Sequence, residues 1–124
     1  MKINFDAIIR DIKTKEPIMD GVRYLHHNGH PVVDDNGLPV ISHPGEALTL
    51  GAISYVALTM EQSEDRQASV SDKMNLVRLA SRIVEGGNTD FSVEDVALLK
   101  KRIGALPQKV VVFQALSLID TAKE

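Results

Sequence analysis

The sequence lacks cysteine altogether, and it also lacks tryptophan. Disulfide bonds, most structural zinc sites and thiol nucleophiles all need cysteine sulfur, so a disulfide-bonded scaffold, the common zinc folds and cysteine catalysis are excluded. Phenylalanine and tyrosine number only 3 and 2, which leaves few rings to stack on unpaired nucleobases. These absences argue against a small secreted scaffold and against recognition of single strands by stacking.

Long apolar runs are also missing, and none approaches the roughly 18 residues that a membrane-spanning helix needs. In the N-terminal segment, Asp6, Arg10 and Asp11 stand among the apolar residues, so the segment has no uninterrupted apolar stretch like that of a secretory signal. We therefore expect a cytoplasmic protein that does not associate with a membrane.

Neither sign of charge dominates the sequence, which has 14 basic and 17 acidic residues and a net charge of -3. A molecule with this balance is not drawn as a whole to nucleic-acid phosphates or anionic lipids. The length of 124 residues and the hydrophobic content of 44% suit one core. We expect a single domain over residues 1–124, with a strand- and turn-rich part in 1–45 and a helical part in 46–124.

Turn-forming residues interrupt the first part of the chain. They are Pro17, Gly21, Asn28-Gly29, Pro31, Asn36-Gly37, Pro39 and Pro44-Gly45. Alternating apolar residues favour a strand over residues 3–9, although Ile8 and Ile12 also fit a short helix. Residues 31–41 place Asn36-Gly37 between two β-branched segments, which predicts a hairpin. Because Pro31 and Pro39 have no backbone N–H, these strands are expected at a sheet edge.

Helical spacing of apolar residues begins at Leu48. Thr49 is the expected N-cap of a first helix that reaches Met60, followed by an exposed connection over residues 61–67. Ser69 is the expected N-cap of a second helix, which Gly86-Gly87 would end.

Two further helices are predicted in the C-terminal part. Ser92 would cap a third helix, with Phe91 packing on Val96, and Gly104 would end it. Pro107 is expected in the first turn of a last helix that continues to residue 119. The predicted fold is α+β and mainly α, with short N-terminal strands or a hairpin followed by a four-helix C-terminal bundle.

Histidine is concentrated in one short region. The four histidines are His26, His27, His30 and His43. Asp34 and Asp35 lie between them, and imidazole with carboxylate suits zinc or another divalent metal. The alternative is a turn-rich surface loop whose histidines face water. We predict no metal and no cofactor, and a metal-dependent enzyme that uses the segment from His26 to His43 is the third functional hypothesis.

Basic residues form one cluster in the region of the third helix. They are Lys100, Lys101, Arg102 and Lys109. This cluster could contact phosphates as a recognition helix does, which makes a nucleic-acid-binding regulator the second hypothesis despite the acidic net charge. The alternative is that cations near a helix C-terminus complement the helix dipole.

Two helical segments, Leu48–Met60 and Val110–Ile119, are apolar on nearly all sides. The residues expected to form a protein interface are Leu50, Ile53, Val56, Met60, Val111 and Phe113. The alternative is that the N-terminal strands cover these faces. Ser42 and Ser54 lack the surroundings of a catalytic serine, and Gly86-Gly87 lacks those of a phosphate loop. We therefore predict no catalytic residue and a non-enzymatic protein.

Three segments carry a resemblance to a family of small uncharacterised bacteriophage and prophage proteins. They are Phe5-Asp6-Ala7-Ile8 with Asp11, Leu48-Thr49-Leu50-Gly51, and the helix from Val93 to Gly104. Residues 21–45 have no counterpart in that pattern and look like an insertion. The resemblance implies a phage-related protein without a catalytic role in the host cytoplasm. The first functional hypothesis is thus a non-enzymatic accessory protein that presents its helices, or the inserted hairpin segment, to a phage or host protein, with a homodimer as a further expectation.

Overall fold

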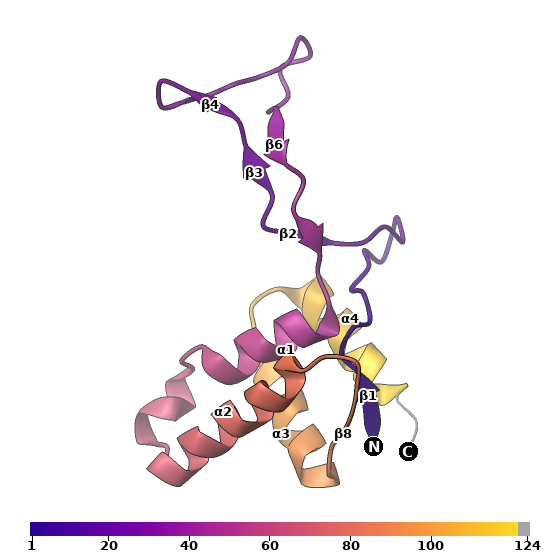
Figure 1. Cartoon of the computed structure of the whole chain (residues 1–124), viewed down its shortest axis with the longest axis vertical. Coiled ribbons are helices and arrows are strands. Elements are labelled where there is room, and N and C mark those ends of the chain that lie inside the picture. The colour runs from indigo at the N-terminus through magenta and orange to yellow at the C-terminus, as the bar shows by residue number, and fades with distance from the viewer. Residues whose placement is uncertain (122–124) are drawn as a thin grey trace.

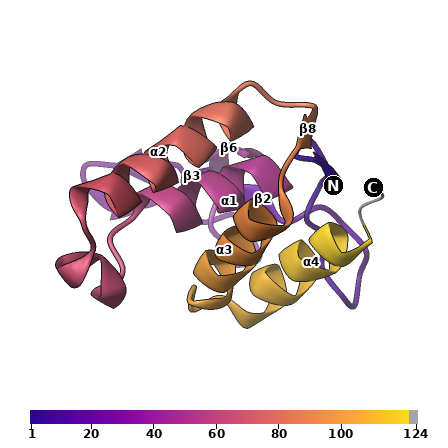
Figure 2. The same cartoon turned by 90° about the horizontal axis from the view of Figure 1, so that it is seen from below.

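The computed structural model describes residues 1–121, and most of these form a helical body (Figure 1). The helices of the body are α1 (Leu50–Thr59), α2 (Val70–Val84), α3 (Val93–Gly104) and α4 (Lys109–Asp120). Helix α1 packs against α2 and α3, and α3 packs against α4 (Figure 2). The predicted α+β, mainly-α class is confirmed. No helix within the described residues has the length and apolar character to cross a membrane.

Short polar side chains begin three of the helices, as the sequence predicts. Thr49, Ser69 and Ser92 each accept a hydrogen bond from the backbone N–H three residues later. The predicted connection after α1 contains a short 3-10 helix, Ser63–Gln67. Placing Pro107 in the first turn of the last helix is wrong, because α4 begins at Lys109. The backbone N–H groups of residues 105 and 106 still bond to α3, so Pro107 belongs to the link between the helices.

The N-terminal segment is part of the helical body. Strand β1 (Lys2–Asn4) pairs antiparallel with β8 (Asn88–Asp90), which joins α2 to α3. The strand expected over residues 3–9 is thus shorter than predicted. Beyond it, the carbonyl of Phe5 accepts a 2.8 Å hydrogen bond from the backbone N–H of Gly51. A Cβ atom at Gly51 would lie 2.9 Å from that carbonyl oxygen, so this close approach requires glycine.

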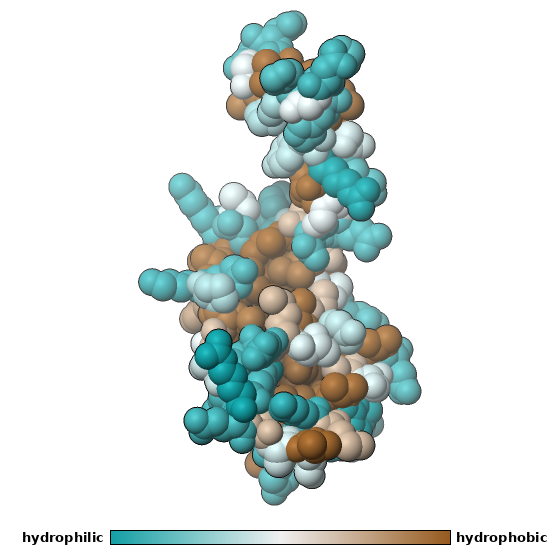
Figure 3. Space-filling view, turned by 90° about the vertical axis from the view of Figure 1, so that its left-hand side faces the viewer, coloured by the Kyte–Doolittle hydropathy of each residue, from teal (hydrophilic) through white to brown (hydrophobic). Residues whose placement is uncertain are grey.

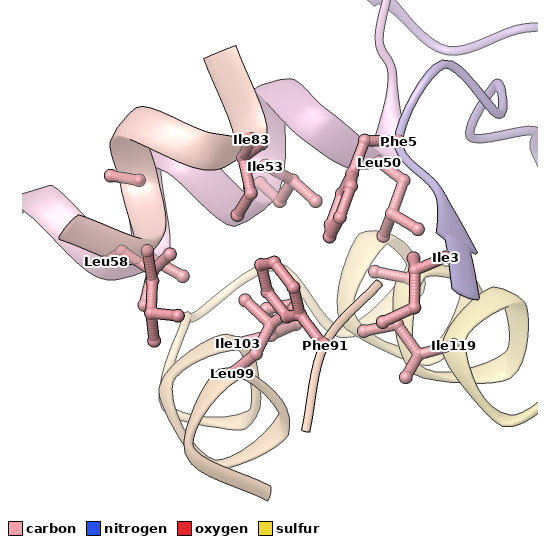
Figure 4. Close-up of a cluster of buried hydrophobic side chains, with 14 of the residues drawn as sticks. Ile3, Phe5, Leu50, Ile53, Leu58, Ile83, Phe91, Leu99, Ile103 and Ile119 are labelled. Atoms are coloured by element: carbon pink, nitrogen blue, oxygen red, sulfur yellow. The ribbon is translucent and has the colours of Figure 1, made fainter. Parts of the chain in front are cut away.

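The hydrophobic core lies where the N-terminal segment meets the four helices (Figure 4). Its buried members include Ile3, Phe5, Leu50, Ile53, Leu58, Ile83, Phe91, Leu99, Ile103 and Ile119. The rings of Phe5 and Phe91 lie 5.4 Å apart and are tilted by 51°, a favourable arrangement for two aromatic rings. The N-terminal strand therefore covers part of the apolar helix surface, although Met60 and Phe113 remain exposed.

Residues 19–47 form an arm that projects from the body (Figure 1). Its paired strands are β2 (Met19–Asp20) with β7 (Glu46–Ala47), β3 (Arg23–Tyr24) with β6 (Ile41–His43), and β4 (His26–His27) with β5 (His30–Pro31). Each of these strands pairs on one side only, as expected for edge strands. No residue of the arm is buried.

The arm contains two turns where the sequence predicts one hairpin. The tight turn is Asn28-Gly29, where φ is 51° and 78°, between the paired residues His27 and His30. The predicted turn at Asn36-Gly37 closes a wider loop, bounded by an isolated bridge from Val33 to Pro39. Only Gly37 of that pair has a positive φ, so the mirror-image turn that Asn-Gly favours does not form there.

Candidate functional site

The arm divides into a stem and a two-lobed head, both visible in Figure 1. The stem consists of the β2–β7 and β3–β6 pairs. At the junction, Leu25, Val32 and Val40 are linked in a ring of backbone hydrogen bonds of 2.8 to 3.0 Å. One lobe is the β4–β5 hairpin and the other is the loop over residues 33–39. These backbone bonds, and not a hydrophobic core, position the head.

Apolar side chains on the arm face solvent. The large exposed members are Met19, Tyr24, Leu25, Val33, Leu38 and Ile41. Tyr24 and Ile41 are cross-strand partners in the stem, so their side chains leave the same face of the ribbon. Leu38 is the most exposed of the set at 61%. Several uncovered apolar side chains on one projecting element are typical of a protein interface.

An open pocket of 740 Å³ lies on the body at the base of the arm. Its lining is mostly apolar and includes Ile18, Leu48, Tyr55, Val56 and Val111. The charged side chains in the lining are Asp6 and Asp20, both acidic. Figure 3 shows that hydrophobic residues also form a broad area on the face of the body below the arm. The molecule thus presents apolar surface on the arm and on the body beside it.

The histidines all lie on the arm and are exposed. His27 and His30 are cross-strand partners, whereas His43 lies in the stem opposite Arg23. The Nδ1 atom of His43 accepts a 3.0 Å hydrogen bond from the backbone N–H of Gly45. The histidines are therefore spread along the arm, and within residues 1–121 no three histidine, aspartate or glutamate side chains gather as a ligand set for a metal ion.

The aspartates between the histidines belong to the second lobe. The Oδ1 atom of Asp34 accepts hydrogen bonds of 2.9 and 3.0 Å from the backbone N–H groups of Asn36 and Leu38. This carboxylate therefore holds the loop closed, which is a common role of aspartate in turns.

The basic cluster of the third helix does not form one surface. Lys100 Nζ lies 2.6 Å from Asp120 Oδ1, and Lys101 Nζ lies 3.0 Å from Glu64 Oε2. The Arg102 side chain is only 1% exposed. Lys109 lies apart from these residues, at the exposed start of α4. Three of the four cations are thus paired with carboxylates of the chain itself.

Arg102 joins α3 to the end of α1, a role that the sequence does not reveal. Its guanidinium donates hydrogen bonds to the backbone carbonyls of Ala57 (2.9 Å) and Met60 (3.1 Å). It also lies 2.6 Å from Asp65 Oδ1, and hydrogen bonding to Arg102 holds the pKa of Asp65 below its ordinary value. The pKa of Glu64 is lowered mainly by hydrogen bonds from Lys101 and then from Arg102. This network fixes the turn between α1 and α2.

The interface residues expected from helical spacing fall into three groups. Leu50 and Ile53 lie in the core. Val56 and Val111 are half-buried and line the pocket. Met60 and Phe113 are each 59% exposed. The inserted hairpin segment was an alternative binding surface, but none of its apolar residues was predicted individually. The many turn formers between Gly21 and Gly45 indicate a segment that cannot bury its own apolar side chains.

Comparison of the chain with models of protein families, with curated proteins and with solved structures finds no match. The resemblance to phage and prophage proteins stays a prediction.

Proposed function

We propose that this chain is a non-enzymatic accessory protein, in a phage-related setting, that acts by binding another protein through its arm. The observation that carries the proposal is the set of exposed apolar side chains on the arm, which no other part of residues 1–121 covers. An apolar surface on a projecting ribbon can lie along a partner over its whole length, and its edge strands can also pair with a strand of that partner.

The energetics of the arm favour a binding role. A single two-stranded hairpin is marginally stable in water, and the strands of the arm are only two or three residues long. Ordering its backbone costs about 1 to 2 kcal/mol per residue, and the arm buries no residue of its own to offset that cost. Burial of its apolar side chains on a partner would contribute roughly 25 cal/mol per Å². A bound partner therefore supplies stabilisation that the free arm lacks.

An affinity capture with matched variants tests the proposal. The wild-type chain, a Tyr24→Ser/Leu38→Ser arm variant and a Met74→Ser control would each be used to capture proteins from a lysate of cells that produce the chain. Met74 is an exposed residue of α2 outside the arm. We expect the wild type and the control to retain the same partner and the arm variant to lose it. Equal capture by all three chains would contradict the proposal.

A further inference from the structure

The chain contains the dipeptide Asn-Gly at two positions, and each lies at the tip of one lobe of the head. Asn28-Gly29 forms the turn of the β4–β5 hairpin, and Asn36-Gly37 lies in the loop over residues 33–39. All four residues are exposed. Because glycine has no side chain, its backbone nitrogen is unusually accessible to the side chain of the residue before it. The two pairs therefore have the same local chemistry and the same access to water.

Asparagine and glycine in this order can react with each other. The glycine nitrogen attacks Cγ of the asparagine and forms a new C–N bond, which closes a five-membered succinimide ring. The bond from Cγ to Nδ2 breaks, and the amino group leaves as ammonia with the proton of the glycine N–H. Water then opens the ring, at Cγ to give aspartate or at the backbone carbonyl to give isoaspartate. The reaction consumes only water and needs no enzyme or cofactor.

The nitrogen of Gly37 is held by its own loop. Its N–H donates a 2.9 Å hydrogen bond to the backbone carbonyl of Asp34. The Asp34 carboxylate accepts hydrogen bonds from the backbone N–H groups on both sides of Gly37, those of Asn36 and Leu38. Attack on Cγ of Asn36 requires rotation of the Asn36-Gly37 peptide and loss of the Gly37 proton, and both steps break the hydrogen bond to the Asp34 carbonyl. The structure of this loop therefore opposes the reaction.

The nitrogen of Gly29 has no such restraint. Among residues 1–121, neither the N–H of Gly29 nor the backbone carbonyl of Asn28 has a hydrogen-bond partner. The hairpin is held instead by the pairing of His27 with His30, on either side of the turn. Rotation of the Asn28-Gly29 peptide therefore breaks no hydrogen bond between groups of the protein.

From this difference we infer that Asn28 is a site of spontaneous covalent modification, where the chain converts Asn28-Gly29 to an aspartyl or isoaspartyl link while Asn36 is protected. Either product adds a negative charge at the tip of the β4–β5 lobe. The isoaspartyl link also adds one methylene group to the backbone between the paired residues His27 and His30, so the two-residue turn is lengthened. The original form of this lobe therefore has a limited lifetime, whether or not the arm binds a partner.

Mass spectrometry of peptides from the aged protein tests the inference. The purified full-length chain would be incubated at mildly alkaline pH, folded in buffer and unfolded in guanidinium chloride, and the rate of conversion measured at each asparagine. Both sites should react at similar rates in the unfolded chain, because both precede glycine. Folding should slow the reaction at Asn36 roughly tenfold more than at Asn28, since the hydrogen bonds of the closed loop must break first. Equal slowing at both sites, or greater slowing at Asn28, would overturn the inference.

Two neighbouring carboxylates supply a matched pair of variants. Asp34→Ala removes the carboxylate that closes the loop, so conversion at Asn36 in the folded chain should rise towards its unfolded rate, with no change at Asn28. Asp35→Ala is the control, because Asp35 is exposed and should leave the ratio of folded to unfolded rates at Asn36 unchanged. Circular dichroism verifies that both variants fold. An Asp34→Ala chain with the wild-type ratio at Asn36 would overturn the protection assigned to the loop.

Discussion

The Nη1 atom of Arg102 lies 2.6 Å from Oδ1 of Asp65, and this contact joins the third helix to the turn that follows the first. The arginine is buried, while Asp65 lies at the edge of the interior. The same guanidinium donates to two backbone carbonyls at the end of α1, Ala57 and Met60, which have no partner within the helix. One side chain therefore pairs with a carboxylate and also donates hydrogen bonds to the carbonyls at the end of α1.

Replacing Arg102 should destabilise the body strongly. Arg102→Met removes the cation, so the partly buried carboxylate of Asp65 keeps only its hydrogen bond from the backbone N–H of Gln62, and the carbonyls of Ala57 and Met60 lose their arginine donor. We expect a cost of about 3 to 5 kcal/mol of unfolding free energy. Lys101→Met is the control, because Lys101 is exposed and its pair with Glu64 contributes about 1 kcal/mol at most. Urea denaturation measures both. Equal stability of the two variants would show that the network does not fix the turn.

Stability should fall in acid through the same network. The pKa of Asp65 is lowered in the folded state by its hydrogen bond with Arg102. A lowered folded-state pKa gives stabilisation that is fully present above the ordinary pKa of an aspartate, about 4, and is lost as the pH falls further. We expect the midpoint of urea unfolding to drop as the pH is lowered from 5 to 3, and to drop less steeply in Asp65→Asn. Parallel profiles for the two chains would contradict this assignment.

Two glycine-to-alanine changes in helices should change the stability of the fold in opposite directions. Gly51→Ala places a methyl group 2.9 Å from the Phe5 carbonyl oxygen and should cost about 1 to 3 kcal/mol as the N-terminal segment is pushed away. A Cβ atom added at Gly104 has no neighbour within 4 Å, so Gly104→Ala should stabilise the fold by up to about 1 kcal/mol through its higher helix propensity. Thermal unfolding distinguishes them. A stabilising Gly51→Ala would mean that the contact is not tight.

The body should fold without the arm. Joining Asp20 to Glu46 through a two-residue Asn-Gly turn removes the stem and head but keeps β2 and β7, whose Asp20 and Glu46 are cross-strand partners. No residue of the arm is buried, so we expect the same helix content and cooperative unfolding. Circular dichroism measures the helix content, and thermal scans measure the cooperativity of unfolding. Loss of cooperative unfolding would show that the arm contributes to the core.

The features that the sequence predicts correctly are those that depend on residues close together in the chain. Thr49, Ser69 and Ser92 cap the helices they were expected to cap, because capping depends on residues three positions apart. The tight hairpin turn was placed at the wrong Asn-Gly pair. Both pairs suit it, and the choice depends on the junction at Leu25, which brings distant residues together.

The candidate site is harder to predict because it depends on tertiary structure. Arg102 follows two lysines and suggests a basic surface, although its spacing from Leu99 places it on the buried face of α3. Leu50 and Ile53 were expected at an interface and are buried, because the N-terminal segment packs on them. Whether an apolar side chain on a turn-rich segment is covered depends on the path of the whole chain, which periodicity does not give.

The pairing of β1 with β8 sets an order of events during synthesis. Residues 2–4 are synthesised before their partners, residues 88–90. The core around Phe5 also needs Phe91 and side chains of α3 and α4, so it closes only when most of the chain has emerged. Until then the apolar N-terminal segment is accessible to chaperones and to neighbouring nascent chains.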